Sequence, residues 1–151
     1  MKNCALMIVT TLLLAACLEE LSNFEEQARQ QARRFAEAYF NYDLKRAMEL
    51  ATPESGKWLR FAASSVTQED LDVINSQEEA ASAVVDGISY VNDSMVIATV
   101  SVGHFFKKDS IGSLPHLVDG EERFPLTIVR REGKCYVRME GLPRSERQSR
   151  D

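Results

Sequence analysis

The sequence predicts an α+β domain in which N-terminal helices pack on a curved antiparallel sheet of about four strands. From residue 21 to about residue 75, apolar residues recur every three or four positions, which is the spacing of amphipathic helices. From Ser82 onward they recur at every second position, which is the spacing of half-buried strands. Helices that come first and strands that follow indicate segregated layers rather than alternating βαβ units.

The first helix of this domain is predicted from one apolar stripe with charged and amide side chains opposite it. The pattern stops at residues 41–43, where Asp43 can cap a second, short helix over residues 44–51. The stripe consists of Leu21, Phe24, Ala28, Ala32, Phe35 and Tyr39.

Two further helix starts follow. Thr52-Pro53-Glu54 combines an N-cap hydroxyl, a proline in the first turn and an acid, and the helix after it carries Trp58. Thr67 and Asp70 have the spacing of a capping box, which predicts another short helix that carries Leu71 and Ile74.

Two hairpins account for the predicted strands. In the first hairpin, at residues 83–106, apolar and polar residues alternate along the second strand. This alternation places one apolar set on one face, with Thr99 and Ser101 on the other; the apolar set is Val96, Ala98, Val100 and Val102. In the second hairpin, Gly133 supplies the positive φ that a tight turn requires. The hairpins are strands 83–91 and 94–106 around a turn at 92–93, then strands 124–131 and 134–140 around a turn at 132–133; residues 107–121 are predicted as a polar loop.

Four segments carry a resemblance to a known fold family. They are residues 35–43 (FAEAYFNYD), 47–54 (AMELATPE), 91–100 (VNDSMVIATV) and 131–137 (REGKCYV). Together they resemble the nuclear-transport-factor-2-like (cystatin-like) cone, in particular the small bacterial lipoproteins of unknown function that adopt it. The resemblance covers residues 24–142 and implies a cone-like domain. Many relatives have Trp where this chain has Cys135.

The N-terminus has the pattern of an export signal. Lys2 precedes an apolar run at residues 4–14, which is too short to span a bilayer. The run ends in Leu14-Ala15-Ala16-Cys17, which resembles the lipobox of bacterial lipoproteins. The alternative is an ordinary signal peptide with an incidental cysteine, although bulky Leu14 is unfavourable for ordinary cleavage after Ala16.

The lipobox resemblance implies cleavage between Ala16 and Cys17 and a lipid on Cys17. It therefore predicts a signal peptide at 1–16 and a lipidated tether at 17–23. The fold resemblance places one domain at 24–142, and the arginines that follow indicate a basic flexible tail at 143–151. Two or three acyl chains attach a protein stably, whereas one chain does so only marginally. Because no Asp follows Cys17, the family pattern implies the outer membrane of a bacterial envelope, on its periplasmic side or at the surface.

Composition excludes several classes of protein. With 151 residues, 44% apolar content and a net charge of −5, the chain has the composition of a globular domain and not of a nucleic-acid binder. After processing, Cys135 is the remaining thiol, so we expect no intrachain disulfide, and alternation places it on a buried strand face. No motif for a metal, phosphate or other cofactor is present.

The sequence favours a non-catalytic module that binds an envelope protein or a small ligand. The alternative is an isomerase or dehydratase that uses His104 in a pocket shared with Tyr39 and Tyr90. The alternation of residues along the strand places His104 on the apolar face. No carboxylate is predicted at an inward position beside His104. Trp58 is a candidate for the wall of a ligand pocket. Packing alone would also explain the positions of His104, Tyr39, Tyr90 and Trp58. A homodimer through the face that carries Thr99 and Ser101 is a third hypothesis.

Overall fold

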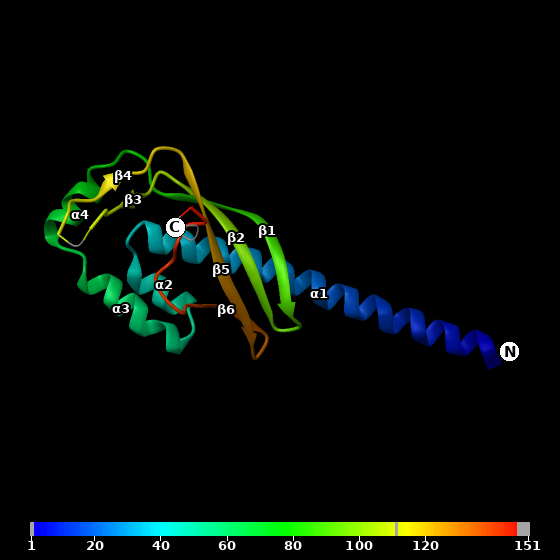
Figure 1. Cartoon of the computed structure of the whole chain (residues 1–151). Helices are drawn as coiled ribbons and strands as arrows, with labels where there is room; N and C mark the ends of the chain where they lie inside the picture. Colours follow the sequence, from blue (N-terminus) through cyan, green and yellow to red (C-terminus); the bar gives the residue numbers. More distant parts are fainter. Residues whose placement is uncertain (1, 111, 148–151) are drawn as a thin grey trace.

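The computed structural model describes residues 2–110 and 112–147, and describes side chains from Leu14 onward. Figure 1 shows a long helix, α1, that crosses one face of a twisted sheet and continues beyond it toward the N-terminus. Within the described residues, no helix is both long and apolar enough to span a membrane. Most of the predicted signal peptide at 1–16 lies outside the residues whose side chains are described.

Helix α1 spans Lys2–Phe40 and contains the predicted stripe. Phe24, Ala28, Ala32 and Phe35 are fully buried against the sheet, as the helical spacing predicted. Leu21, the first residue of the predicted stripe, is not part of the buried face, because its side chain is 44% exposed. The predicted tether, residues 17–23, is part of the same helix.

The C-terminal end of α1 is a Schellman motif with tyrosine in the position usually held by glycine. The Asp43 N–H donates to the Ala38 carbonyl at 2.9 Å, and the Tyr42 N–H donates to the Tyr39 carbonyl at 3.1 Å. Tyr42 therefore has a φ of 61°, in the left-handed region that disfavours a residue with a Cβ. Asp43 then caps α2 (Leu44–Leu50), as predicted, by accepting the Arg46 N–H at 3.1 Å.

The remaining helices begin where the sequence places them. A 3₁₀ turn, η1 (Pro53–Ser55), leads into α3 (Gly56–Ser64), and the predicted capping box of Thr67 and Asp70 starts α4 (Gln68–Asn75). Thr52 does not cap through its side chain. Its hydroxyl instead contacts that of Ser55 at 2.7 Å, and Ser55 accepts the N–H of Met139 at 2.8 Å, which joins η1 to the sheet.

The described residues form a four-stranded antiparallel sheet in the order β1-β2-β5-β6, which confirms the predicted α+β class. Glu132 and Gly133 make the β5–β6 turn with φ values of 51° and 76°. The β1–β2 turn comes one residue later than predicted, because Asn92 still pairs with Met95. The strands are β1 (Ser82–Asn92), β2 (Met95–Gly103), β5 (Glu121–Arg131) and β6 (Lys134–Arg138).

The segment between β2 and β5 differs from its prediction. The second strand ends at Gly103 and not at residue 106, because His104 has a φ of 55° and turns the chain out of the sheet. The predicted loop at 107–121 contains a small two-stranded sheet of β3 (Phe106–Lys107) and β4 (His116–Leu117). In Figure 1 this small sheet and α4 lie together at the end of the molecule farthest from the N-terminus.

The core lies between α1 and the inner face of the sheet. The predicted apolar face of β2 is fully buried, and Val100 lies opposite Phe124 of β5. Cys135 is buried on β6, as predicted, with its Sγ 3.9 Å from Oε1 of Gln27. The buried residues of β2 are Val96, Ala98, Val100 and Val102.

The predicted basic tail begins as a packed segment. Ser145 is buried, and the Glu146 N–H donates to the Arg123 carbonyl of β5 at 2.9 Å. The stretch is basic in composition, but this backbone bond holds residues 143–147 against the sheet. The rest of the predicted tail, residues 148–151, lies outside the described residues.

Candidate functional site

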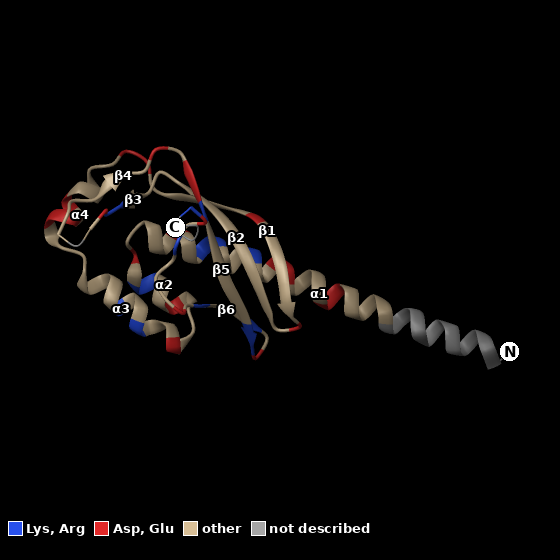
Figure 2. Ribbon diagram, in the orientation of Figure 1, with Lys and Arg blue, Asp and Glu red and all other residues tan. Residues whose placement is uncertain are grey.

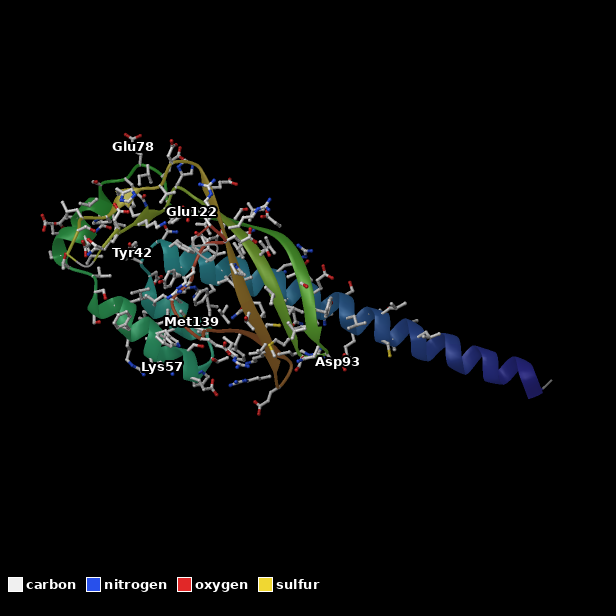
Figure 3. All side chains as sticks on the ribbon, in the orientation of Figure 1. Tyr42, Lys57, Glu78, Asp93, Glu122 and Met139 are labelled. Carbon is white, nitrogen blue, oxygen red and sulfur yellow. The ribbon has the colours of Figure 1, made fainter. Side chains whose placement is uncertain are left out.

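A cavity of about 330 Å³ lies where the end of α1 meets α3, β3 and β5. This volume is at the lower end of the range for small-ligand pockets. Figure 3 labels Tyr42 and Glu122, which lie toward the end of the molecule that carries α4. The lining residues are Tyr39, Phe40, Tyr42, Leu44, Ala62, Ser65, Val66, Phe105, Phe106, Lys107, Lys108, Glu122, Phe124, Leu142 and Pro143.

Aromatic rings form much of the cavity wall. The ring of Phe40 has its centroid 5.1 Å from that of Phe105 and 4.6 Å from that of Phe124. Tyr39 meets Phe40 edge to face at 5.1 Å. These rings pack against one another in edge-to-face and tilted arrangements and give the cavity an aromatic, apolar surface.

Glu122 places a carboxylate on this apolar wall. It pairs with Val102 across the antiparallel ladder and is two residues from Phe124, so its side chain shares the inner face of the sheet. The side chain is only 10% exposed, and Lys107 Nζ lies 3.7 Å from its Oε1. Its Oε2 is buried and has no hydrogen-bond partner among the described residues.

Two tyrosines in the wall are held in their neutral form. Burial raises the pKa of Tyr39 far above its ordinary value, and the neighbouring Tyr42 adds to this effect. Burial also raises the pKa of Tyr42, with a further contribution from the negative charge of Asp70. At neutral pH both phenols are therefore uncharged groups that can donate or accept a hydrogen bond.

A second ion pair borders the cavity. Lys108 Nζ lies 2.8 Å from Oδ2 of Asp70, and the same carboxylate accepts the Thr67 N–H at 2.8 Å. The hydrogen bond from Lys108 is the largest cause of the lowered pKa of Asp70, followed by the bond from the Thr67 backbone. Lys108 thus enters the cavity wall with its charge already balanced.

The structure does not bring the four predicted pocket residues together. Of these four described residues, Tyr39 alone lines the cavity. Tyr90 is exposed on β1, where its hydroxyl donates to the Leu21 carbonyl at 3.3 Å. Trp58 is half-buried beside Glu54, Arg131 and Met139, with Lys57 Nζ 5.1 Å from its ring centroid.

The inward position predicted for His104 is wrong. Side chains alternate between the two faces of a sheet only while the backbone stays extended. The left-handed conformation at His104 interrupts this alternation and turns its side chain outward. The side chain is 56% exposed, and its Nε2 lies 3.2 Å from Oε2 of Glu79, which is also exposed. His104 therefore does not face the cavity.

Glu122 was missed for a related reason. The predicted loop ended at Glu121 and the next predicted strand began at Phe124, so Glu122 was assigned to neither element and an inward carboxylate was not expected. In the structure β5 begins at Glu121 and includes Glu122. Extending the alternation of Leu126 and Phe124 back by two residues would have placed Glu122 on the inner face.

The remaining predicted sites lie apart from the cavity. Cys17 is exposed on α1, seven positions before Phe24. On the outer face of the sheet, Ser101 Oγ donates to Asp86 Oδ2 at 2.6 Å, and Arg123 Nε lies 3.3 Å from the same oxygen. Among the residues that the structure describes, no three His, Cys, Asp or Glu side chains gather into a candidate metal site.

No family model and no curated protein matches the chain. Among solved structures, the chain is similar to an Ntf2-like protein involved in plasmid conjugation, with 17% sequence identity and a TM-score of 0.42. The match covers 80% of this chain and 48% of the other, so it spans about half of that protein's length.

Proposed function

We propose that this domain is a non-catalytic binding module for a small ligand, held at a bacterial cell envelope by a lipid on Cys17. The observation that carries the binding function is the cavity of about 330 Å³, whose aromatic wall contains a buried, incompletely paired carboxylate at Glu122. Concave, largely apolar pockets with a few converging polar groups are typical ligand sites.

The geometry favours binding over the alternative enzyme. An isomerase or dehydratase that uses His104 needs its imidazole within reach of a bound substrate. His104 instead faces Glu79 at the surface, outside the residues that line the cavity. The polar groups that do line it offer hydrogen bonds and balanced charges, which suits recognition of a ligand.

Two neighbouring alanines of α3 allow a matched test of binding. Ala62 lines the cavity, whereas Ala63 is exposed on the same helix. We expect small aromatic fragments to shift the amide NMR signals of Phe105 and Phe124 in the full-length chain. Ala62→Trp should block these shifts by filling the cavity, and Ala63→Trp should preserve them. Fragments that shift no cavity signal, or shifts that survive Ala62→Trp, would contradict the binding function.

Support for the anchor comes from the sequence around Cys17 and from where the domain begins. Leu14-Ala15-Ala16-Cys17 has the lipobox pattern, and Cys17 is exposed. Basic residues gather where β5 turns into β6 (Figure 2), and there Arg130 Nη1 lies 3.5 Å from Oε1 of Glu20 on α1. An ion pair between α1 and the sheet thus lies three residues after Cys17, and the first core residue, Phe24, lies seven residues after it.

The anchor can be tested by metabolic labelling. In bacterial cells, Cys17→Ser should abolish incorporation of labelled palmitate and leave the chain at its unprocessed mass. Cys4→Ser is the matched control, because a cysteine within the leader should have no part in lipidation. Equal palmitate incorporation in the Cys17→Ser variant and the natural chain would refute the anchor.

A further inference from the structure

We infer that the cavity selects uncharged molecules that combine an apolar, ring-sized body with an O–H or N–H donor directed at Glu122. This inference rests on the proposed function, because it names the class of ligand that the same cavity would bind. It depends on three features: a buried acceptor atom without a partner, wall lysines that already have a carboxylate beside them, and aromatic surfaces.

The acceptor is Oε2 of Glu122. It is buried and has no partner among the described residues, while Oε1 has Lys107 Nζ at 3.7 Å. Leaving a buried polar atom without a hydrogen bond is costly, and hydrogen bonds to charged groups are stronger than those between neutral groups. A ligand that donates to Oε2 therefore supplies a hydrogen bond that the described residues do not make.

The charges around the cavity disfavour an ionic ligand. Lys107 lies beside Glu122, Lys108 is paired with Asp70, and Tyr39 is neutral. An additional carboxylate would meet the like charge of Glu122, and an additional ammonium group would compete with Lys107 for that carboxylate, so either ion would lose its hydration with little compensation. An alcohol, phenol or heterocyclic N–H can donate to Oε2 without this cost.

The walls define the rest of the ligand. The rings of Phe40, Phe105 and Phe124 contact one another at centroid distances between 4.6 and 5.6 Å, so they present fixed faces and edges. A flat aromatic or compact aliphatic body can pack against these surfaces in place of water. The volume suits a fragment-sized molecule and not a long acyl chain.

Four probes with the same ring separate these requirements. Benzyl alcohol carries a donor, benzyl methyl ether lacks it, benzylamine is cationic at neutral pH and benzoate is anionic. Each would be titrated into the full-length chain, with the amide NMR signals of residues 105–108 and 122–124 as the readout. We expect benzyl alcohol to bind about tenfold more tightly than the ether, and also more tightly than either ion.

Variants of β5 complete the test. Glu122→Leu removes the acceptor and should equalise the affinities for benzyl alcohol and its ether. Glu121→Leu, on the exposed neighbour, is the matched control and should keep the preference for the alcohol. Equal binding of alcohol and ether by the natural chain would overturn this inference but leave the binding function intact. Tighter binding of benzylamine or benzoate would also overturn it, and failure of all four probes would refute both proposals.

Discussion

Lys108 and Asp70 form an ion pair of 2.8 Å that joins the end of β3 to the capping box of α4. The carboxylate of Asp70 has two tasks, since it also accepts the N–H of Thr67 at 2.8 Å. The two contacts fix α4 against the segment that carries Phe106 and Lys107, and therefore support one border of the cavity. The stability of this border should depend on the charge of Asp70.

Asp70→Asn should destabilise the protein at neutral pH by about 1–3 kcal/mol, because it weakens hydrogen bonds to a charged, buried group. The folded-state pKa of Asp70 is lowered, so its stabilising effect is present above the pKa of the unfolded chain and is lost as the pH falls through the lowered folded-state value. Chemical denaturation should therefore show a difference at pH 7 that shrinks in strong acid. Asp72→Asn, on the exposed side of α4, is the control and should have a small effect; a pH-independent difference for Asp70→Asn would contradict the role of its charge.

Cys135 should react slowly with thiol reagents in the folded chain. Burial raises the pKa of its thiol, so the reactive thiolate is scarce at neutral pH and is also poorly accessible. In chain that has not been lipidated, iodoacetamide followed by peptide mass spectrometry should modify exposed Cys17 well before Cys135. Denaturation should remove the difference, and rapid modification of Cys135 in the native state would show that β6 is not packed as described.

The effect of a substitution at His104 on stability should depend on the left-handed backbone there and not on burial of the side chain. His104→Gly should be as stable as the natural chain or slightly more so, because glycine accepts the left-handed φ of 55°. His104→Val should lose about 1–2 kcal/mol, because a β-branched residue is strained there. Thermal unfolding measures both effects. A stabilising His104→Val would point to an inward side chain, and loss of fragment binding in His104→Gly would point to a role in the site.

Tyr42→Gly should separate stability from binding. Glycine relieves the left-handed strain at the end of α1, worth about 1 kcal/mol, and this gain offsets part of the burial lost with the tyrosine ring. The free energy of unfolding should therefore change by less than about 1 kcal/mol. Affinity for benzyl alcohol should nevertheless fall severalfold, because Tyr42 lines the cavity. Unchanged affinity at unchanged stability would remove Tyr42 from the binding surface.

The sequence predicted the layers of this fold because their patterns are local. The stripe around Phe24 and Phe35 and the alternation around Val100 each reflect one buried face, and the structure buries both. Capping by Asp43 and by the pair Thr67 and Asp70 was also predictable, since caps depend on side chains within three residues. These elements required no knowledge of distant contacts.

The candidate site could not be predicted in the same way. His104 was misplaced because a single left-handed residue ends the alternation on which its position depended. Glu122 was assigned to neither the predicted loop nor the predicted strand, and its inward position follows from pairing with Val102 on another strand. Trp58 and Tyr90 lie on separate surfaces, and only the packing of α3 and β1 decides which surface each one meets.

The length of α1 sets how far the cavity lies from Cys17, the proposed site of the lipid. A helix rises 1.5 Å per residue, so about 10 Å of helix separates Cys17 from the first core residue, Phe24, and about 24 Å more leads to Phe40 beside the cavity. The hairpin ends near Tyr90 and Arg130 contact the part of α1 closest to the anchor. A lipid at Cys17 would thus lie closer to these turns than to the cavity, which is at the other end of this stretch of α1.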